Sequence, residues 1–227
     1  DGLLGVGASV FNALSQGQTV ELARDFSHYD MRSASQFDGK KGKVVAGKPD
    51  APLAKVGNTR KKGTLVRFLP DDAIFEDVRF NYDTVFRRLQ ELAYLNRGLK
   101  IVFLDERVSD PARRETTFHY EGGIIDYVRY LNDGKTVLHD QPIYLEGQKD
   151  SVICRVAIQY TDGYTESLFS YVNNIPTGEG GTPETGFKAA FTKMFHDYAR
   201  RNGFLKEKDS NLPGQDFRAG LHRMWAT

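Results

Sequence analysis

The sequence predicts an α+β protein in which helices and strands are mixed without regular βαβ alternation. Strict alternation of apolar and polar residues over 152–160 is typical of a half-buried strand. Apolar residues at helical spacing predict two long helices, over 82–93 and 187–198. Hydrophobic residues make up 40% and charged residues 27% of the 227 residues, as in an ordinary globular protein.

The first half of the chain contains the more varied pattern. Its expected elements are a helix within 3–15, a strand over 19–24, a loop or hairpin excursion over 39–62, a strand over 64–68, the helix over 82–93, a strand over 99–104, a turn over 105–114 and a strand over 116–120. Asn96-Arg97-Gly98 is a typical C-terminal stop for the helix that precedes it.

The second half begins with a short helix expected over 124–131. Asp162-Gly163 predicts a hairpin turn that joins the strand over 152–160 to a return strand over 168–172. A Gly-rich connection over 177–181 leads into the last long helix, which ends at Asn202-Gly203.

Charge and cysteine content narrow the functional classes. There are 31 Lys and Arg against 30 Asp and Glu, so any DNA contact must come from a local basic patch rather than the whole surface. The single cysteine, Cys154, excludes an internal disulfide and suits a reducing compartment, which favours the cytoplasm. No apolar run is long enough to span a bilayer, and no leader pattern is visible. Because the chain opens at Asp1 inside a Gly-rich motif, we expect the true N-terminus to be missing.

The Gly-rich run Gly2-Leu3-Leu4-Gly5-Val6-Gly7 leads directly into a predicted helix. Glycine backbone approaches a phosphate closely, and a helix N-terminus offers unpaired N–H groups. On physical grounds alone a tight turn is the preferred interpretation. The run is not a Walker A loop, because no Gly-Lys-Ser/Thr follows, and it lacks the preceding strand of a dinucleotide fingerprint.

Five motifs that follow one another along the chain change the preferred interpretation of this Gly-rich run. They are GLLGVGASVFNALS at 2–15, KGTLVRFLPD at 62–71, RLQELAYLN at 88–96, FHYEGGI at 118–124 and NNIPTGEGGT at 173–182. Together they resemble the B subunits of bacterial type IIA DNA topoisomerases, the family of gyrase and topoisomerase IV. The resemblance extends to about Leu221, nearly the whole chain.

The resemblance implies two domains. Residues 1–122 would be the C-terminal part of a GHKL-type ATPase domain, the kind found in Hsp90 and MutL. Residues 123–227 would be a truncated transducer domain similar to domain 2 of ribosomal protein S5, and we expect this half to fold as its own unit. The ATP-lid residues would be Gly2, Leu3, Leu4, Gly5, Val6 and Gly7. Thr64 would lie at the adenine pocket.

Several positions depart from the family pattern. Asp1 stands where the family usually has Gly, Leu4 and Pro183 stand where it has His, and the tail after Leu221 lacks the expected apolar strand. We therefore expect both ends to be truncated or altered. The family's catalytic Glu and Mg²⁺-binding Asn fall before Asp1, and its phosphate-binding Lys falls after Thr227. No catalytic residue or metal ligand is thus matched in this chain, although the resemblance implies ATP and Mg²⁺ as cofactors.

By resemblance, ATP binding would close two B subunits into a clamp around duplex DNA, and the transducer would signal to the gyrase A subunit within an A2B2 heterotetramer. DNA would be contacted by the last long helix through Lys188, Lys193, Arg200 and Arg201. No membrane association is expected. The loop before Gly63 and the wording of residues 121–127 favour the gyrase branch over topoisomerase IV. A MutL-like nucleotide-binding scaffold and an α+β interaction domain with a degenerate lid are the alternatives.

Overall fold

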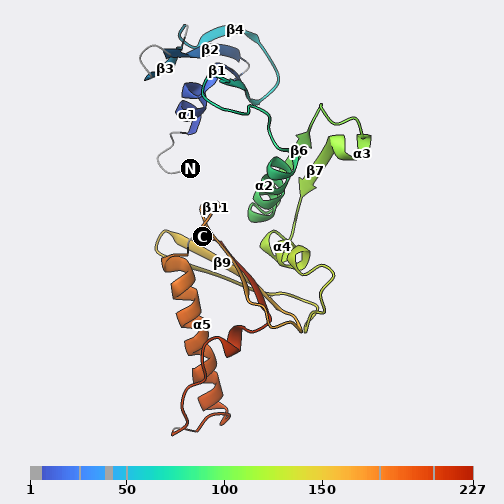
Figure 1. Ribbon diagram of the computed structural model, residues 1–227, viewed down its shortest axis with the longest axis vertical. Coiled ribbons are helices and arrows are strands. Elements are labelled where there is room, and N and C mark those ends of the chain that lie inside the picture. Colours follow the sequence, from blue (N-terminus) through green and yellow to red (C-terminus); the bar gives the residue numbers. More distant parts are fainter. Residues whose placement is uncertain are drawn as a thin grey trace. The chain divides into compact units, whose positions relative to one another are not determined.

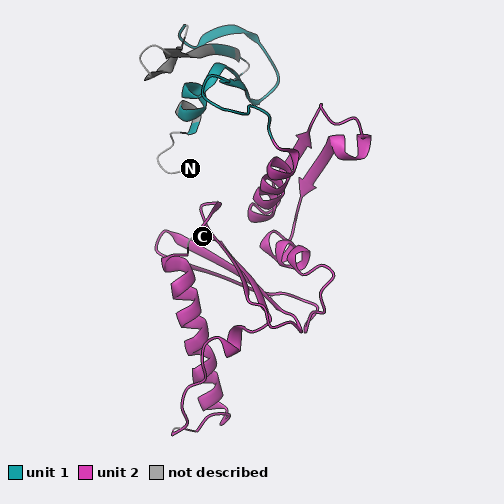
Figure 2. Ribbon diagram, viewed as in Figure 1, with its two compact units in different colours: residues 1–80 teal, residues 81–227 magenta. Residues whose placement is uncertain are grey.

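The computed structural model describes residues 7–25, 27–38, 43–49, 51–178, 180–206 and 208–226. The chain divides into two compact units, Asp1–Phe80 and Asn81–Thr227 (Figure 2). No sheet is shared between the units in the described part of the chain, so each unit is described separately below. No helix in the described part of the chain is long and apolar enough to cross a membrane.

Unit 1 is an antiparallel sheet with one short helix (Figure 1). Its elements are α1 (Gly7–Ala13), β1 (Ser15–Arg24), β2 (Ser27–Asp38), β3 (Lys43–Pro49), β4 (Ala54–Asn58) and β5 (Gly63–Pro70). The strand order is β3-β2-β1-β5, and β4 also pairs with β2. The strands predicted over 19–24 and 64–68 are confirmed as parts of β1 and β5.

The structure of unit 1 differs in part from two predictions, those for residues 39–62 and 3–15. The loop or hairpin excursion expected over 39–62 contains two strands, β3 and β4. The hairpin alternative is confirmed by the antiparallel pairing of β2 with β3, and the loop alternative is wrong where these strands lie. Both strands pair with β2 through backbone hydrogen bonds. Backbone pairing does not require apolar alternation, so a Gly-, Lys- and Pro-rich composition concealed them. Of the helix expected within 3–15, Gly7–Ala13 is helical, and residues 3–6 lie outside the described residues.

Unit 2 begins with α2 (Tyr82–Leu95), followed by β6 (Lys100–Leu104), α3 (Pro111–Arg114) and β7 (Glu115–His119). The Asn81 side chain caps α2 by accepting a hydrogen bond from Thr84 N at 2.9 Å. β6 and β7 pair with each other in antiparallel fashion. The turn expected over 105–114 includes one helical turn, α3. Asp110 caps this turn and Pro111 occupies its first position, a combination that starts a helix.

The larger sheet of unit 2 follows. Its elements are α4 (Ile124–Leu131), β8 (Ile143–Lys149), β9 (Val152–Tyr160), β10 (Ser167–Val172), β11 (Ile175–Pro176), α5 (Thr182–Arg201), the 3-10 turn η2 (Asp216–Arg218) and β12 (Leu221–Ala226). The strand order is β11-β10-β12-β9-β8. The helices and strands predicted from periodicity are all present here.

The connection between β9 and β10 differs from the prediction. The two strands do not form a hairpin, because β12 lies between them, antiparallel to β9 and parallel to β10. The tail after Leu221, predicted to lack an apolar strand, is therefore the central strand of the sheet. Leu221 and Met224 are fully buried on it. A central strand is covered on both faces, so its sequence shows no alternation that would reveal it.

The two faces of this sheet carry separate cores. Neighbouring residues on a strand point to opposite faces, so Ala157 faces one core while Val156 and Ile158 face the other. The first core packs against α2 and α4 and comprises Tyr94, Leu95, Ile124, Tyr127, Val128, Ala157, Tyr171 and Met224. The second packs against α5 and comprises Val156, Ile158, Phe187, Phe191 and Leu221.

The first core crosses the domain boundary predicted at 122–123. Tyr94 of α2 stacks on Tyr127 of α4 with ring centroids 4.7 Å apart, and on Tyr120 at 3.6 Å. α2 therefore shares its packing with the sheet that follows. The boundary between compact units lies between Phe80 and Asn81, while the boundary at 122–123 stays a prediction about family domains.

Candidate functional site

The predicted phosphate-binding run lies mostly before the described part of the chain. Gly2, Leu3, Leu4, Gly5 and Val6 are outside the described residues. Gly7 is exposed and is the first residue of α1. A Cβ atom built on Gly7 would meet no atom of the described residues within 4 Å. The run thus leads into a helix N-terminus, as predicted.

Thr64 lies near the start of β5, opposite Leu22 of β1. It is exposed and lines an open groove together with Glu21, Asn58 and Lys62. Glu21 also forms an ion pair with Arg67, further along β5. Phe68 and Pro70, at the other end of β5, belong to a different pocket. The role of Thr64 at an adenine pocket stays a prediction.

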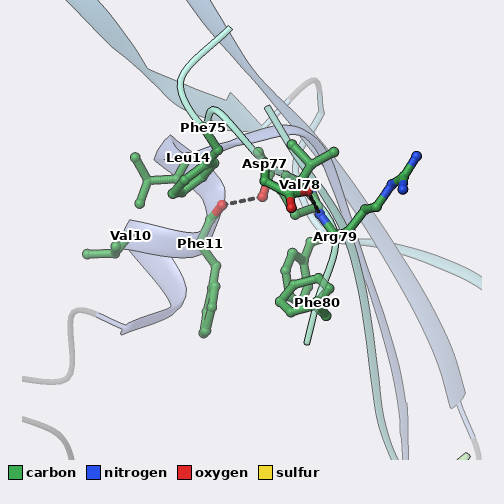
Figure 3. A pocket seen from close by; sticks show the side chains of 11 residues that line it. Val10, Phe11, Leu14, Phe75, Asp77, Val78, Arg79 and Phe80 are labelled. Carbon is green, nitrogen blue, oxygen red and sulfur yellow. Dashed lines mark hydrogen bonds between the residues drawn. The ribbon is translucent and has the colours of Figure 1, made fainter. Parts of the chain in front are cut away.

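An apolar pocket of about 270 Å³ lies inside unit 1, and the sequence analysis missed it (Figure 3). Val10 and Phe11 of α1 form one side together with Leu14, which directly follows the helix, and Phe75 and Phe80 come from the segment after β5. The ring of Phe68 lies between the two sides, 5.1 Å from Phe11 and 6.1 Å from Phe80. The signal available was the pair Phe75 and Phe80 after Pro70, whose spacing of five residues fits neither a helical nor a strand period.

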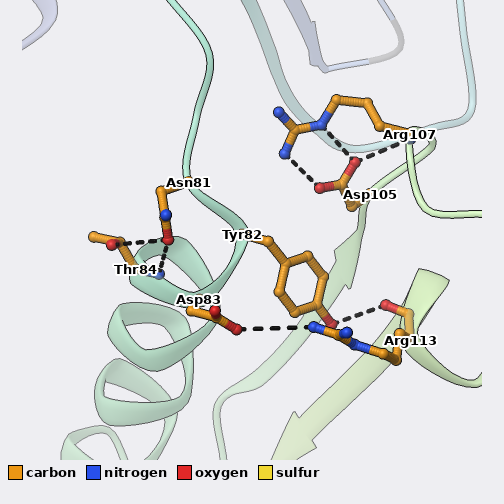
Figure 4. Close-up of polar contacts among 7 residues, drawn as sticks. All are labelled: Asn81, Tyr82, Asp83, Thr84, Asp105, Arg107 and Arg113. Atoms are coloured by element: carbon orange, nitrogen blue, oxygen red, sulfur yellow. Dashed lines mark hydrogen bonds and ion pairs between the residues drawn. The ribbon is translucent and has the colours of Figure 1, made fainter.

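The polar contacts at the start of α2 are structural (Figure 4). Tyr82 Oη donates to the backbone oxygen of Arg113 at 2.8 Å, and Asp83 lies 3.9 Å from the Arg113 guanidinium. Arg107 donates to both oxygens of Asp105, and these hydrogen bonds hold the pKa of that carboxyl at about 2. An aspartate kept ionised in this way is a poor general base, so we assign the Asp105–Arg107 pair to stabilising the turn after β6. The contacts of Tyr82 and Asp83 with Arg113 join α2 to α3.

The four cations predicted to face DNA all lie on α5, but they differ in their surroundings. Lys188 is paired with Glu184, and Lys193 with Asp197 at 2.6 Å. Arg200 donates to the backbone oxygens of Lys206 and Asp209 and to Asn211 Oδ1, at 2.7–3.1 Å. It therefore holds the segment that follows the helix.

Arg201 is exposed and makes no hydrogen bond or ion pair within the described part of the chain. Lys188, Lys193 and Arg200 line one open groove together with Arg218 of η2. The structure thus brings three of the four predicted cations to a common groove. Arg201 lines a neighbouring groove with Lys193 and Tyr198. Among the described residues, no group of three or more His, Cys, Asp or Glu side chains is arranged to hold a metal ion.

Comparison with known proteins shows which proteins the chain resembles. Residues 123–224 match the family described as DNA gyrase B. The DNA gyrase B subunit of Bacillus mycoides is 45% identical over 222 residues, 97% of this chain and 51% of the relative. The chain is thus similar to DNA gyrase B subunits over 97% of its length. It is also 47% identical to the DNA topoisomerase 4 B subunit of Enterococcus faecalis, over 97% of this chain and 30% of the relative.

Comparison with solved structures also finds gyrase B. The crystal structure of the 43K ATPase domain of Thermus thermophilus gyrase B, in complex with an aminocoumarin, matches with a TM-score of 0.77 and 35% identity. The match covers 98% of this chain and 57% of that structure. The predicted α+β fold with a GHKL-type ATPase relationship is confirmed. The chain spans about half of the B. mycoides relative and about a third of the E. faecalis relative.

Proposed function

We propose that this chain is the nucleotide-responsive part of a type II DNA topoisomerase B subunit, of the gyrase kind. The observation that carries the proposal is the continuous 45% identity to the DNA gyrase B subunit over 97% of the chain. In the whole protein, ATP binding and hydrolysis would drive clamp closure around duplex DNA and supercoiling. Its partners would be a second B subunit, through ATP-driven dimerisation, together with two copies of the gyrase A subunit in an A2B2 assembly in the bacterial cytoplasm.

ATP would be held by the run from Gly2 to Gly7, with Thr64 at the adenine pocket. The N-terminus of α1 would suit a phosphate group, because the first backbone N–H groups of a helix lack partners within it. The side chain of Leu4 would contribute packing but no hydrogen bond. Carboxylate ligands for Mg²⁺ are not gathered among the described residues, so no step is assigned to that ion.

DNA would meet α5 through Lys188, Lys193, Arg200 and Arg201. Lys188 and Lys193 are each paired with a carboxylate, and Arg200 is bound to oxygens of the segment after α5, so these cations would have to share or exchange their partners to contact phosphates. Contacts of this kind neutralise phosphates without reading base sequence. The charge of the chain as a whole is close to zero, so DNA affinity would depend on this local surface.

Nucleotide binding tests the proposal directly. We expect the 227-residue chain to bind a non-hydrolysable ATP analogue weakly and to show no ATP turnover, because no residue is matched to the family's general base. Replacing Leu4→His should tighten binding, since a hydrogen bond to a charged group contributes about 1.5–3 kcal/mol. Calorimetric titration of both proteins measures this difference. Equal affinities would mean that Leu4 does not face the phosphates, and no binding by either would contradict the nucleotide site.

The topoisomerase IV B subunit is the second candidate, and the 47% identity to the E. faecalis protein supports it. The two differ in the reaction of the assembled enzyme. An A2B2 assembly that introduces negative supercoils into relaxed plasmid favours the gyrase kind. An assembly that only relaxes or decatenates DNA favours topoisomerase IV.

A further inference from the structure

α2 is tied to the turn between β10 and β11 by polar bonds that the proposed function does not use. Glu91 of α2 accepts hydrogen bonds on both carboxylate oxygens. Arg88 Nη1 donates to one, and Tyr171 Oη of β10 donates to the other. Arg88 Nη2 also donates to the backbone oxygen of Asn174 at 2.7 Å. Arg88 thus bridges its own helix and a turn 86 residues later in the chain.

Burial makes these bonds more than surface contacts. Tyr171 is 2% exposed, the Glu91 side chain is 18% exposed and the Arg88 side chain is 39% exposed. Burial, followed by the hydrogen bond to Glu91, raises the pKa of Tyr171, so its hydroxyl keeps the proton that it donates. A carboxylate that is mostly shielded from water needs both donors, because removing one leaves a charge without full compensation.

The turn that Arg88 contacts contains two consecutive residues with positive φ angles. Asn173 and Asn174 both adopt positive φ angles, 49° and 66°, as a tight two-residue hairpin requires. Asn174 Nδ2 donates a further hydrogen bond to Asn96 Oδ1 at 3.2 Å, at the C-terminal end of α2. α2 therefore contacts this turn from two points along its length, through Arg88 and Asn96.

The turn that Arg88 contacts is followed by α5 after only a few residues. Thr177 N donates to the backbone oxygen of Ser170 at 2.8 Å, which closes the β10–β11 hairpin. Only residues 178–181 separate Thr177 from the start of α5 at Thr182. Gly180 N also donates to the backbone oxygen of Thr177 at 2.9 Å, which restrains this Gly-rich stretch, so a displacement of the turn would be carried to the first turn of α5.

We propose that Arg88 and Glu91 form an interlock that fixes α2 to the β10–β11 turn and so sets the position of the N-terminal end of α5. Arg88 is a positioning residue in this device. α2 is the first element of the chain after unit 1. The interlock would pass a movement of α2 to the helix that carries the basic residues, and this consequence rests on the proposed function.

Amide hydrogen exchange on the intact 227-residue chain, without nucleotide or DNA, tests the interlock. In Arg88→Met we expect exchange at Thr177 and Thr185 to rise about tenfold, which corresponds to about 1.4 kcal/mol of local stability. Amides in the middle of α5 should keep their rates. Arg87→Met is the matched control, because Arg87 is exposed and makes no hydrogen bond or ion pair in the described part of the chain.

A second variant separates local release from general unfolding. Glu91→Gln keeps the shape of the side chain and should produce the same local pattern. Arg88→Lys should fail to restore wild-type rates, because one ammonium group does not span Glu91 and the turn as a guanidinium does. Unchanged rates in Arg88→Met and Glu91→Gln, or a uniform rise across all of α5, would overturn the interlock. Because no nucleotide or DNA is present, this outcome is independent of the proposed function.

Discussion

Arg223, whose side chain is completely buried on β12, donates a hydrogen bond to Glu166 next to the start of β10. Arg218 donates to the other oxygen of Glu166 at 3.2 Å, and the Arg223 guanidinium lies 5.0 Å from the centre of the Phe187 ring. Within the described structure, Nε and Nη1 of Arg223 have no hydrogen-bond partner. The central strand of the larger sheet therefore carries a buried charge that depends on one carboxylate.

The first prediction concerns this pair. Glu166→Gln should destabilise the chain by about 3 kcal/mol, because it leaves the buried guanidinium without its counter-charge. Arg223→Met in the same background should recover much of the loss, since a flexible apolar side chain fills the space without a charge. Urea unfolding of both single variants and the double variant measures the coupling. Strictly additive losses would show that the two residues do not interact energetically.

A second prediction follows from Gly220, which lies directly before β12. Its φ is +70°, and a Cβ atom there would lie 2.4 Å from the backbone oxygen of Gly163 and 2.5 Å from that of Thr161. Gly220→Ala should combine a left-handed backbone cost of about 1–2 kcal/mol with a steric cost of about 1–3 kcal/mol. Gly203→Ala is the control, since Gly203 has a φ of +75° with nothing within 4 Å of its Cβ position. Thermal unfolding should show a clearly larger loss for Gly220→Ala; equal losses would contradict the close approach.

The third prediction is a pH dependence of stability. His222 is buried on β12, and burial, followed by the charge of Lys135, lowers the pKa of its imidazole below the usual 6.5. As the pH falls, the unfolded chain binds a proton on His222 before the folded chain does. The contribution of the neutral, buried His222 to the free energy of unfolding is therefore fully present above about pH 6.5 and is lost at lower pH. For one proton, the free energy of unfolding cannot change by more than about 1.4 kcal/mol per pH unit. Replacing His222→Gln should flatten urea-measured stability between about pH 7.5 and about pH 5, and an unchanged profile would exclude His222 as the cause.

The fourth prediction concerns the folding unit. Because Tyr94 packs between Tyr120 and Tyr127, residues 81–226 should unfold as one cooperative unit in urea. A fragment of residues 123–226 lacks α2 and exposes part of the first core, so its unfolding midpoint should be lower. Equal midpoints for the two fragments would mean that the boundary predicted at 122–123 is also a folding boundary.

The fifth prediction separates the arginines at the end of α5. Arg201→Ala should weaken binding to double-stranded DNA and reduce the salt dependence by about one phosphate contact, without a change in melting temperature. Arg200→Ala should also loosen the segment over 206–211 that Arg200 holds, so it is the less specific test. Lys100→Ala, an exposed charge loss on β6, is the control. If Arg201→Ala and Lys100→Ala behave alike, the proposed DNA surface must lie elsewhere.

Local patterns were sufficient for most of the helices and strands. The apolar stripes of α2 and α5 and the alternation along β9 are each recorded in consecutive residues, so they could be recognised without knowing the fold. The five colinear motifs were likewise enough to indicate the family, because each is read within a short stretch. The lid residues before Gly7 stay predictions, since they lie outside the described residues.

Such local patterns could not predict which residues distant in the sequence pair with each other. The insertion of β12 between β9 and β10 depends on hydrogen bonds between residues more than 50 positions apart, and no local period encodes that partnership. Glu166 neutralises Arg223 only because the sheet brings them together, which is why a tail containing a charge could become a central strand. The grip of Arg88 on Asn174 has the same origin. Periodicity assigns a segment to a helix or a strand, but the partner of a buried polar group is set by packing in three dimensions.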